Sequence, residues 1–448
     1  MTTTPASPAP HLLAPLRRPA FRRLWPGLVA SRLGDHFTTI ALLWFVLQLT
    51  GSGAALGVIV LCFALPGLVT GPPLGRLLDR YQPRLVMGLD NLARGLVIAA
   101  IPALAFAGIL RLWQIAALAL LAGALAPASQ VGARIVVPQL VPDDELERAN
   151  ALAAVSMQLS YLVGPALAGL VVVAVGGPWA LLIDAASFLV MAALVFTLPD
   201  VPRAAPVERR WDRGNELGFR PLFHVKEVRI VTLLSLVFFL AYGPLEPALP
   251  LYSRETLGAG AAGYGLLWSA FGAGMLAGLL LTTRLVGHGR PGVAFAAIAV
   301  LWGLLLAPLA VLTQLGPALL CFALAGAAWA PYSTVELSLL QRRIPAEIRG
   351  AVFGARATLT GGVVAFGPVL GGVLLDHLAA PAVIGLSALA CVITGLGGLL
   401  SPTLRAVRHQ HADDRAGAPP QNDRKAGRIA APCGRVGHGA AIPRHGDR

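Results

Sequence analysis

The sequence contains few charged residues for its length. Charged residues make up 13% of the 448 residues, while hydrophobic residues make up 56%. Soluble domains carry about 25% charged residues and roughly 45–50% apolar residues. A soluble protein of this size could not cover its surface with so few polar side chains. The composition therefore predicts a protein whose outer surface faces the hydrocarbon of a membrane.

Several patterns that would indicate an enzyme are absent. Lys226 and Lys425 are the only lysines, and neither stands in the Gly-x-x-x-x-Gly-Lys pattern of a phosphate-binding loop. No His-Glu-x-x-His or Gly-x-Ser-x-Gly pattern occurs, and the four cysteines have neither CxxC nor metal-type spacing. We therefore expect no catalytic residues, no metal and no cofactor.

Apolar stretches of spanning length, about 20 residues each, recur along the chain. They form two groups of six on either side of one polar stretch. The predicted spans are 24–49, 54–77, 85–109, 112–136, 149–175, 178–198, 230–251, 260–286, 293–313, 317–340, 352–375 and 382–400. The predicted fold class is an all-α membrane protein with twelve transmembrane helices in two pseudo-symmetric six-helix bundles.

The basic residues alternate between the two sides of these predicted spans. Thirty of the 35 Lys and Arg fall in the N-terminal segment, in every second connection and in the C-terminal tail, whereas Arg111 and Arg254 lie on the opposite side. Cytoplasmic connections are enriched in Lys and Arg, so we expect both termini in the cytoplasm. The net charge is +13, but the basic residues are distributed between apolar runs and form no single basic face. We therefore expect no nucleic-acid partner.

The same pattern divides the chain into four parts. Residues 1–198 are expected to form a short cytoplasmic N-terminus and the first bundle, and 199–229 the central cytoplasmic loop. Residues 230–400 form the second bundle, and 401–448 a basic, disordered cytoplasmic tail. We expect a monomer in the inner membrane of a bacterium, with the lipid bilayer as its main partner.

The two groups of spans carry an internal repeat. The repeated residues are prolines and glycines separated by 203 positions: Pro142 and Pro345, Gly164 and Gly367, Pro165 and Pro368, Gly169 and Gly372. Repeated halves are how many transporters build a central site that opens to either side of the membrane.

A motif follows the second predicted span. Residues 75–84 read Gly-Arg-Leu-Leu-Asp-Arg-Tyr-Gln-Pro-Arg, which resembles the G-x-L-A-D-R-x-G-R-R/K pattern of the major facilitator superfamily. Gln82 and Pro83 replace the later glycine and the basic residue after it, so the turn is altered. Over about residues 21–400 the chain resembles the drug-exporter branch of this superfamily, typified by macrolide and enterobactin exporters. Other matching segments are 21–25, 34–35, 138–142 and 149–152.

The resemblance implies a gating role for this motif, which Gly75, Asp79, Arg80 and Arg84 match. In the superfamily the acidic residue helps to hold the outward-facing state. A carboxylate there can bond to a helix N-terminus or an arginine, and Asp79 could reach the start of the eleventh span or Arg134. A solvated turn is the alternative.

A second motif lies in the fifth predicted span and is repeated in the eleventh. A Gly-Pro step removes one backbone hydrogen bond and permits a kink, while small residues permit close packing. The pattern resembles the fifth-helix motif of antiporters, and helix packing accounts for it equally well. The residues of the two copies are Gly164, Pro165, Gly169, Gly367, Pro368 and Gly372.

Four charged residues within the predicted spans can form ion pairs along a helix. A charge at the bilayer centre costs at least about 2.5–3.5 kcal/mol, so such residues are paired or face water. Arg32 and Asp35 are three residues apart, and Asp90 and Arg94 four apart, so each pair shares a helix face. For Asp90 and Arg94 we favour a structural ion pair.

Proton coupling needs a buried carboxylate whose proton affinity changes with hydration and nearby charge. The candidates are Asp35, which lies nearest the middle of the membrane, Glu336 and then Glu246. Glu336 has no cation on its helix face before Arg343 and is expected to be the freer group. A structural ion pair with Arg32 is the alternative for Asp35.

The leading hypothesis is a secondary transporter that exports small amphipathic drugs or natural products by proton antiport and alternating access. A proton-coupled importer of a small nutrient remains open, as does a non-transporting receptor or scaffold on the same fold. The low polar content of the spans favours an apolar cargo, and costly intramembrane acids argue against a scaffold. Aromatic residues at suitable depths for cargo are Trp44, Phe45, Phe63, Phe238, Phe239, Tyr242, Trp268, Phe271, Trp329 and Tyr332.

Overall fold

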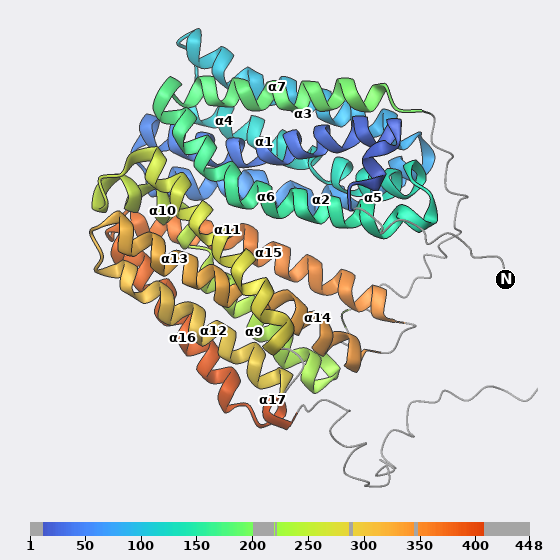
Figure 1. Ribbon diagram of the computed structural model, residues 1–448. Helices are drawn as coiled ribbons and strands as arrows, with labels where there is room; N and C mark the ends of the chain where they lie inside the picture. Colours follow the sequence, from blue (N-terminus) through green and yellow to red (C-terminus); the bar gives the residue numbers. More distant parts are fainter. Residues whose placement is uncertain (1–11, 200–218, 220–221, 286–289, 345–347, 407–448) are drawn as a thin grey trace, which may run out of the picture. The chain divides into compact units, whose positions relative to one another are not determined.

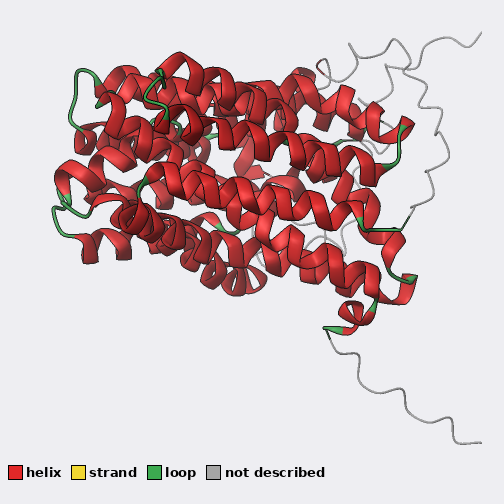
Figure 2. Cartoon of the chain, turned by 90° about the horizontal axis from the view of Figure 1, so that it is seen from above, coloured by secondary structure: helices red, strands yellow, loops and turns green. Residues whose placement is uncertain are grey.

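The computed structural model describes residues 12–199, 219, 222–285, 290–344 and 348–406; the side chains of 72, 79, 280–285 and 350 are not described. Most of the expected central loop and of the tail therefore lies outside the described residues. Every regular element in the described part is helical (Figure 2). These elements belong to one unit of the chain, which ends at Arg408.

The first half of the chain contains seven helices of ten residues or more and one short 3₁₀ turn. They are η1 (Ala14–Arg17), α1 (Pro19–Thr50), α2 (Gly53–Arg80), α3 (Pro83–Phe106), α4 (Leu112–Leu125), α5 (Pro127–Leu140), α6 (Asp143–Val175) and α7 (Gly177–Phe196). α7 packs against both α3 and α1, and α1 packs along α6 (Figure 1).

The second half follows the same plan. Its described elements are α9 (Lys226–Tyr242), α10 (Leu245–Leu251), the π-helical turn η2 (Tyr252–Thr256), α11 (Gly260–Leu285), α12 (Pro291–Leu306), the 3₁₀ turn η3 (Ala307–Ala310), α13 (Leu315–Trp329), α14 (Tyr332–Arg343), α15 (Arg349–Leu375), α16 (Ala380–Leu400) and α17 (Pro402–Ala406). Here α12 packs along α16, and α11 along α13.

Proline divides several predicted spans into two helices. α5 begins at Pro127 directly after α4, and α14 follows Pro331 in the corresponding span of the second half. α10 likewise follows Pro244. Proline lacks an N–H donor and its ring clashes with the preceding turn, so it starts a helix readily and interrupts one. These breaks were not predicted from the sequence, because a single proline hardly changes the mean apolar character of a span.

Eleven segments among the described residues are long and apolar enough to cross a membrane. α1 is not one of them, although it has 32 residues. Its charged side chains, which include Arg32 and Asp35, lower its mean hydropathy. Eleven of the twelve predicted spans are therefore confirmed by length and composition.

The surface of the described helices is apolar. Val69 is 73% exposed, Trp113 69% and Leu400 70%. Such side chains would be costly in water, and they are what a helix bundle presents to lipid.

Glycines bring helices of the first half against helices of the second. A side chain at Gly57 of α2 would lie 2.5 Å from the carbonyl oxygen of Pro368 in α15. One at Gly169 of α6 would lie 2.5 Å from the carbonyl oxygen of Ala261 in α11. Only a residue without a Cβ permits backbones to approach this closely.

A short helix lies within the segment 401–448 that was expected to be disordered. Residues Pro402–Ala406 form α17, because Leu404 is fully buried and its backbone contacts Gly292 at the start of α12. The prediction of disorder is wrong for these residues, and residues 407–448 lie outside the described part.

Candidate functional site

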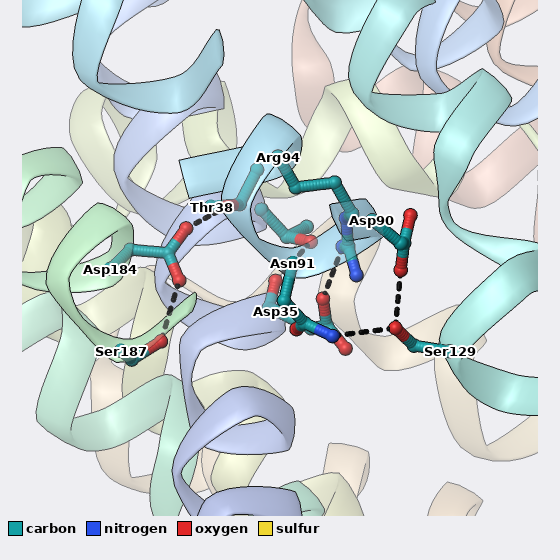
Figure 3. Close-up of polar contacts among 9 residues, drawn as sticks. Asp35, Thr38, Asp90, Asn91, Arg94, Ser129, Asp184 and Ser187 are labelled. Atoms are coloured by element: carbon teal, nitrogen blue, oxygen red, sulfur yellow. Dashed lines mark hydrogen bonds and ion pairs between the residues drawn. The ribbon is translucent and has the colours of Figure 1, made fainter. Parts of the chain in front are cut away.

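An ion pair joins α1 and α3 in the first half (Figure 3). Arg94 Nη2 donates to Asp35 Oδ1 at 2.7 Å. The Arg94 side chain is 6% exposed and that of Asp35 is 44% exposed. The guanidinium carbon also lies 4.2 Å from the ring centroid of Phe188 in α7, a favourable cation–π geometry. The arginine is therefore fixed within the bundle, whereas the carboxylate remains accessible.

Asp90 does not form the ion pair expected with Arg94. Its carboxylate instead accepts a hydrogen bond from the Ser129 hydroxyl of α5, and Ser129 in turn accepts from Asn91 Nδ2 at 2.7 Å (Figure 3). Arg94 points from α3 toward α1, so the in-helix pairing is replaced by a contact between helices. Sequence spacing predicts which residues are neighbours along one helix. It does not predict which side chain of an adjacent helix will be the closer partner.

A third carboxylate, Asp184 of α7, is 1% exposed. It accepts hydrogen bonds from the hydroxyls of Thr38 in α1 and of Ser187 one turn along α7 (Figure 3). A side chain at Gly34 would collide with both Asp184 and Ser187. Among the described residues Asp184 makes no ion pair. Asp184 and its hydroxyl partners are not among the predicted site residues, although Thr38 lies three residues from Asp35 on the same helix face.

Arg32 does not bond to Asp35, contrary to the second expected in-helix pair. Its Nη1 donates to the carbonyl oxygen of Ala153 in α6 at 2.5 Å. His36 follows Asp35, and its ring meets Tyr161 of α6 edge-on at 4.9 Å between centroids. The middle of α1 therefore carries a polar stripe that faces α3, α6 and α7.

A second ion pair lies in the other half of the chain. Arg356 of α15 binds Glu336 of α14. The Arg356 side chain is 13% exposed and the Glu336 side chain 11% exposed. Glu336 also accepts hydrogen bonds from the hydroxyls of Ser235 and, at 3.2 Å, Tyr332. The expectation that Glu336 is the freer group is wrong, because Arg356 of α15, which is distant in the sequence, supplies a cation.

Glu246 of α10 is the remaining candidate acid. Its carboxylate accepts a hydrogen bond from the Tyr242 hydroxyl at 3.0 Å, and it makes no ion pair within the described part of the chain. The three candidate carboxylates therefore differ: Asp35 and Glu336 are paired with arginines, and Glu246 is not.

The residues of the gating motif lie at the end of α2 and the start of α3. Apart from its own helix turn, no atom of the described residues lies within 4 Å of where a Cβ would stand at Gly75. The Arg80 guanidinium lies 5.8 Å from the Tyr81 ring centroid. Arg84 Nη1 donates to the carbonyl oxygen of Leu198 at 2.7 Å. The side chain of Asp79 is not described, and Arg134 is exposed. The expected partner of Asp79 stays a prediction.

The residues of the Gly-Pro motif pack helices together. Gly164 faces the ring of His36, and the packing of Gly169 against α11 is described above. In the other copy Gly367 faces Gly243 and Gly372 faces Gly53. Both prolines, Pro165 and Pro368, lie inside continuous helices. Close packing accounts for these glycines, and the antiport-specific role stays a prediction.

A pair that the sequence analysis missed fastens the N-terminal segment to α6. Arg18 donates two hydrogen bonds to the Glu145 carboxylate, at 2.7 and 3.2 Å. These bonds raise the pKa of the Arg18 guanidinium above its ordinary value. Glu145 lies in the first turn of α6 with Asp143 and Asp144, where negative charge complements the helix dipole.

A helix bundle with eleven candidate spans and paired charges inside it defines a polytopic membrane protein. Solved structures of the same fold include the nucleoside transporter NupG (TM-score 0.72, 13% identity, 87% of this chain and 100% of that one). A D-xylose-proton symporter also matches (TM-score 0.65, 16% identity, 85% and 97%). At these identities the likeness shows a shared fold alone.

The family follows from the sequence comparison. The family described as transmembrane secretion effector, within the major facilitator superfamily, matches residues 11–428, and the chain belongs to it. Multidrug efflux pump Tap of Mycobacterium tuberculosis is 27% identical over 399 residues, 87% of this chain and 94% of that protein. Macrolide efflux protein A of Streptococcus pyogenes is 24% identical over 370 residues, 80% and 90%. The resemblance to the drug-exporter branch is thereby confirmed, and these relatives are transporters.

Proposed function

We propose that this chain exports small amphipathic drugs or natural products from a bacterial cell by proton antiport. The names of the relatives support the direction and the cargo class, since Tap is a multidrug efflux pump and the streptococcal protein a macrolide efflux protein. The apolar composition of the spans supports an amphipathic cargo. We propose a monomer in the inner membrane.

The proposed topology has twelve spans in two six-helix bundles, with both termini in the cytoplasm. α1 supplies the twelfth span, since its 32 residues reach roughly 48 Å at 1.5 Å per residue. Residues of its polar stripe bond to α3, α6 and α7, and charged residues that are paired within a bundle are tolerated inside a membrane. The distribution of Lys and Arg supports the orientation.

The observation that carries the proposed coupling is the asymmetry of the Asp35–Arg94 pair. Protonation of Asp35, the accessible member, removes the charge that holds Arg94 to α1. A buried guanidinium that loses its partner must find another acceptor or move toward water. Loading a proton on Asp35 therefore changes the relative stability of two arrangements of α1 and α3, which is what coupling to alternating access requires.

The rest of the polar cluster supports proton uptake in this half. Its carboxylates are those of Asp35, Asp90 and Asp184, while its guanidiniums are those of Arg32 and Arg94. Carboxylates outnumber guanidiniums, and an uncompensated buried charge is costly, so the cluster favours at least one bound proton. In the proposed orientation Asp184 lies seven residues from the outer end of α7 and Asp90 seven residues from the inner end of α3, each roughly 10 Å deep. Asp35 lies between these depths.

Accumulation of ethidium in cells tests the direction and the energy source. Cells expressing the wild type should hold at least threefold less dye than cells with an empty vector, and a protonophore should remove the difference. Asp35→Asn, expressed at the same level, should behave as the empty vector does. Higher accumulation with the wild type would instead indicate import, and a difference that survives the protonophore would exclude proton coupling.

A further inference from the structure

Helices α2 and α15 belong to different halves and are in close contact at one end only. Near the start of α2, a side chain at Gly372 of α15 would lie 2.7 Å from the carbonyl oxygen of Gly53, and Gly57 is similarly close to Pro368. A Cβ at Gly75, about five helical turns further along the same face of α2, would have no described neighbour within 4 Å beyond its own helix. In the proposed topology the end in close contact faces outward, and the other end faces the cytoplasm.

A carboxylate of the second half lies at the start of α2. Asp376 is the C-cap residue of α15, and its Oδ1 accepts from the Ala54 N–H at 3.4 Å and from the Ser52 hydroxyl at 3.5 Å. Ser52 is the N-cap residue of α2. A negative charge is favourable at a helix N-terminus and unfavourable at a C-terminus. Asp376 is therefore stabilised by α2 of the other half and not by its own helix.

A cation of the second half lies at the end of α1. Arg254 of η2 donates from Nη1 to the carbonyl oxygen of Leu47, in the last turn of α1, at 3.5 Å, and pairs with Glu255 at 2.6 Å. A positive charge is favourable at a helix C-terminus. Arg254 is one of the two basic residues expected on the outer side, where Lys and Arg are depleted. The contact with α1 gives this exception a structural reason.

Only Gly51 and Ser52 connect α1 to α2, so both charges hold one hairpin. The internal repeat does not reproduce this arrangement, because the residue 203 positions before Asp376 is Val173. We propose that Asp376 and Arg254 form an outer latch, in which two charges of the second half hold the α1–α2 hairpin of the first half by its helix ends.

The outer latch stabilises the arrangement in which the outer end is closed, and it must release before cargo can leave. The inference rests on the proposed export function and topology. Asp376 and Arg254 are positioning residues, which set the equilibrium between two states of the carrier and touch neither cargo nor the coupling proton. A charge at a helix end changes such an equilibrium by roughly twofold to fivefold. The two charges together should therefore change it by about tenfold.

Double electron–electron resonance on the purified full-length protein tests the latch, because it measures the equilibrium without transport. Nitroxide labels are placed on cysteines at Val175 and Val311, which are exposed and lie at the outer ends of their halves, after the four native cysteines are replaced by alanine. This parent protein should show mainly the short distance. Asp376→Ala and Arg254→Gln should each raise the ratio of long to short distances at least twofold, and together about tenfold. Arg111→Gln, which removes the other outer arginine, is the matched control and should leave the ratio unchanged.

A charge-swapped variant separates attraction to the helix ends from direct attraction between the two side chains. Asp376→Arg combined with Arg254→Asp keeps the net charge and presents each helix end with the unfavourable sign. Its ratio of long to short distances should therefore exceed that of the neutral double variant. Elution of every variant at the parent position in size-exclusion chromatography reports an intact fold.

Four results would overturn the proposal. They are a mainly long distance in the parent, an unchanged ratio in the neutral double variant, an equal rise with Arg111→Gln, and a ratio in the charge-swapped variant below that of the neutral one. Failure of the export proposal has a different signature, since it would abolish protonophore-sensitive dye export and leave these distances as they are.

Discussion

Arg94 is buried in the first half of the chain and its ion-pair partner, Asp35, is not. The two side chains meet at 2.7 Å with exposed fractions of 6% and 44%. The pair thus combines a buried positive charge with a partly exposed carboxylate. Phe188 covers one face of the guanidinium, which leaves Arg94 little freedom to follow Asp35 when α1 moves.

Removing one member of this pair should destabilise the protein more than removing both. Asp35→Ala leaves Arg94 buried without a partner, and breaking a buried pair costs roughly 3–5 kcal/mol, less where one member is exposed. Asp35→Ala and Arg94→Met should each lower the unfolding temperature in detergent, measured by fluorescence size-exclusion chromatography. The double variant should recover at least half of the larger loss. Strictly additive losses would show that the two residues do not interact.

The Glu336–Arg356 pair should act on stability and not on coupling. Both side chains are nearly buried, so neither is well placed to exchange protons with water. We expect Glu336→Gln to lower the unfolding temperature and to retain the dependence of transport on a pH gradient. Arg356→Met in the same protein should restore part of the stability. If Glu336→Gln remained stable and lost only its proton dependence, the roles assigned to the two pairs would be reversed.

Asp184 should tolerate a neutral isostere. Its partners are the Thr38 and Ser187 hydroxyls, each of which donates to a different carboxylate oxygen. In an asparagine one hydroxyl can still donate to the amide oxygen, and the other can accept from the amide N–H. Asp184→Asn is expected to unfold at or above the wild-type temperature, whereas Asp184→Ala removes the acceptor of the buried Thr38 hydroxyl and of the partly buried Ser187 hydroxyl and should lose roughly 1–3 kcal/mol. Equal destabilisation by Asn and Ala would show that the negative charge itself is needed.

The contact between α2 and α15 should depend on Gly57. A valine there would collide with the backbone at Pro368, whereas the Cβ of one at Gly71 of the same helix would have no described neighbour within 4 Å outside its own helix turn. Gly57→Val should therefore reduce ethidium export at least tenfold, and Gly71→Val should remain near wild type at equal expression. Comparable activity of the two variants would mean that this close approach is not needed for transport.

Much of the fold could be predicted from the sequence, because a membrane span is defined by its own length and apolar character. α1 is the exception, because the polar residues of its stripe lower its mean hydropathy, and span prediction depends on mean hydropathy. The charge pairs could not be predicted in the same way. Asp90 and Arg94 are one turn apart, yet each bonds to a different helix, and Glu336 receives its cation from α15. Which side chains pair depends on how each helix is rotated and packed against its neighbours. The spacing of residues within one helix does not give this information.

The most direct test of the account compares two transport modes in proteoliposomes containing wild type or Asp35→Asn. One mode is accumulation of ethidium driven by an imposed pH gradient, and the other is exchange of labelled for unlabelled ethidium without any gradient. The account predicts that Asp35→Asn loses gradient-driven accumulation and keeps exchange, because the carrier can still alternate without taking up a proton. Gradient-driven accumulation equal to wild type in Asp35→Asn would contradict the assignment of Asp35 as the coupling acid.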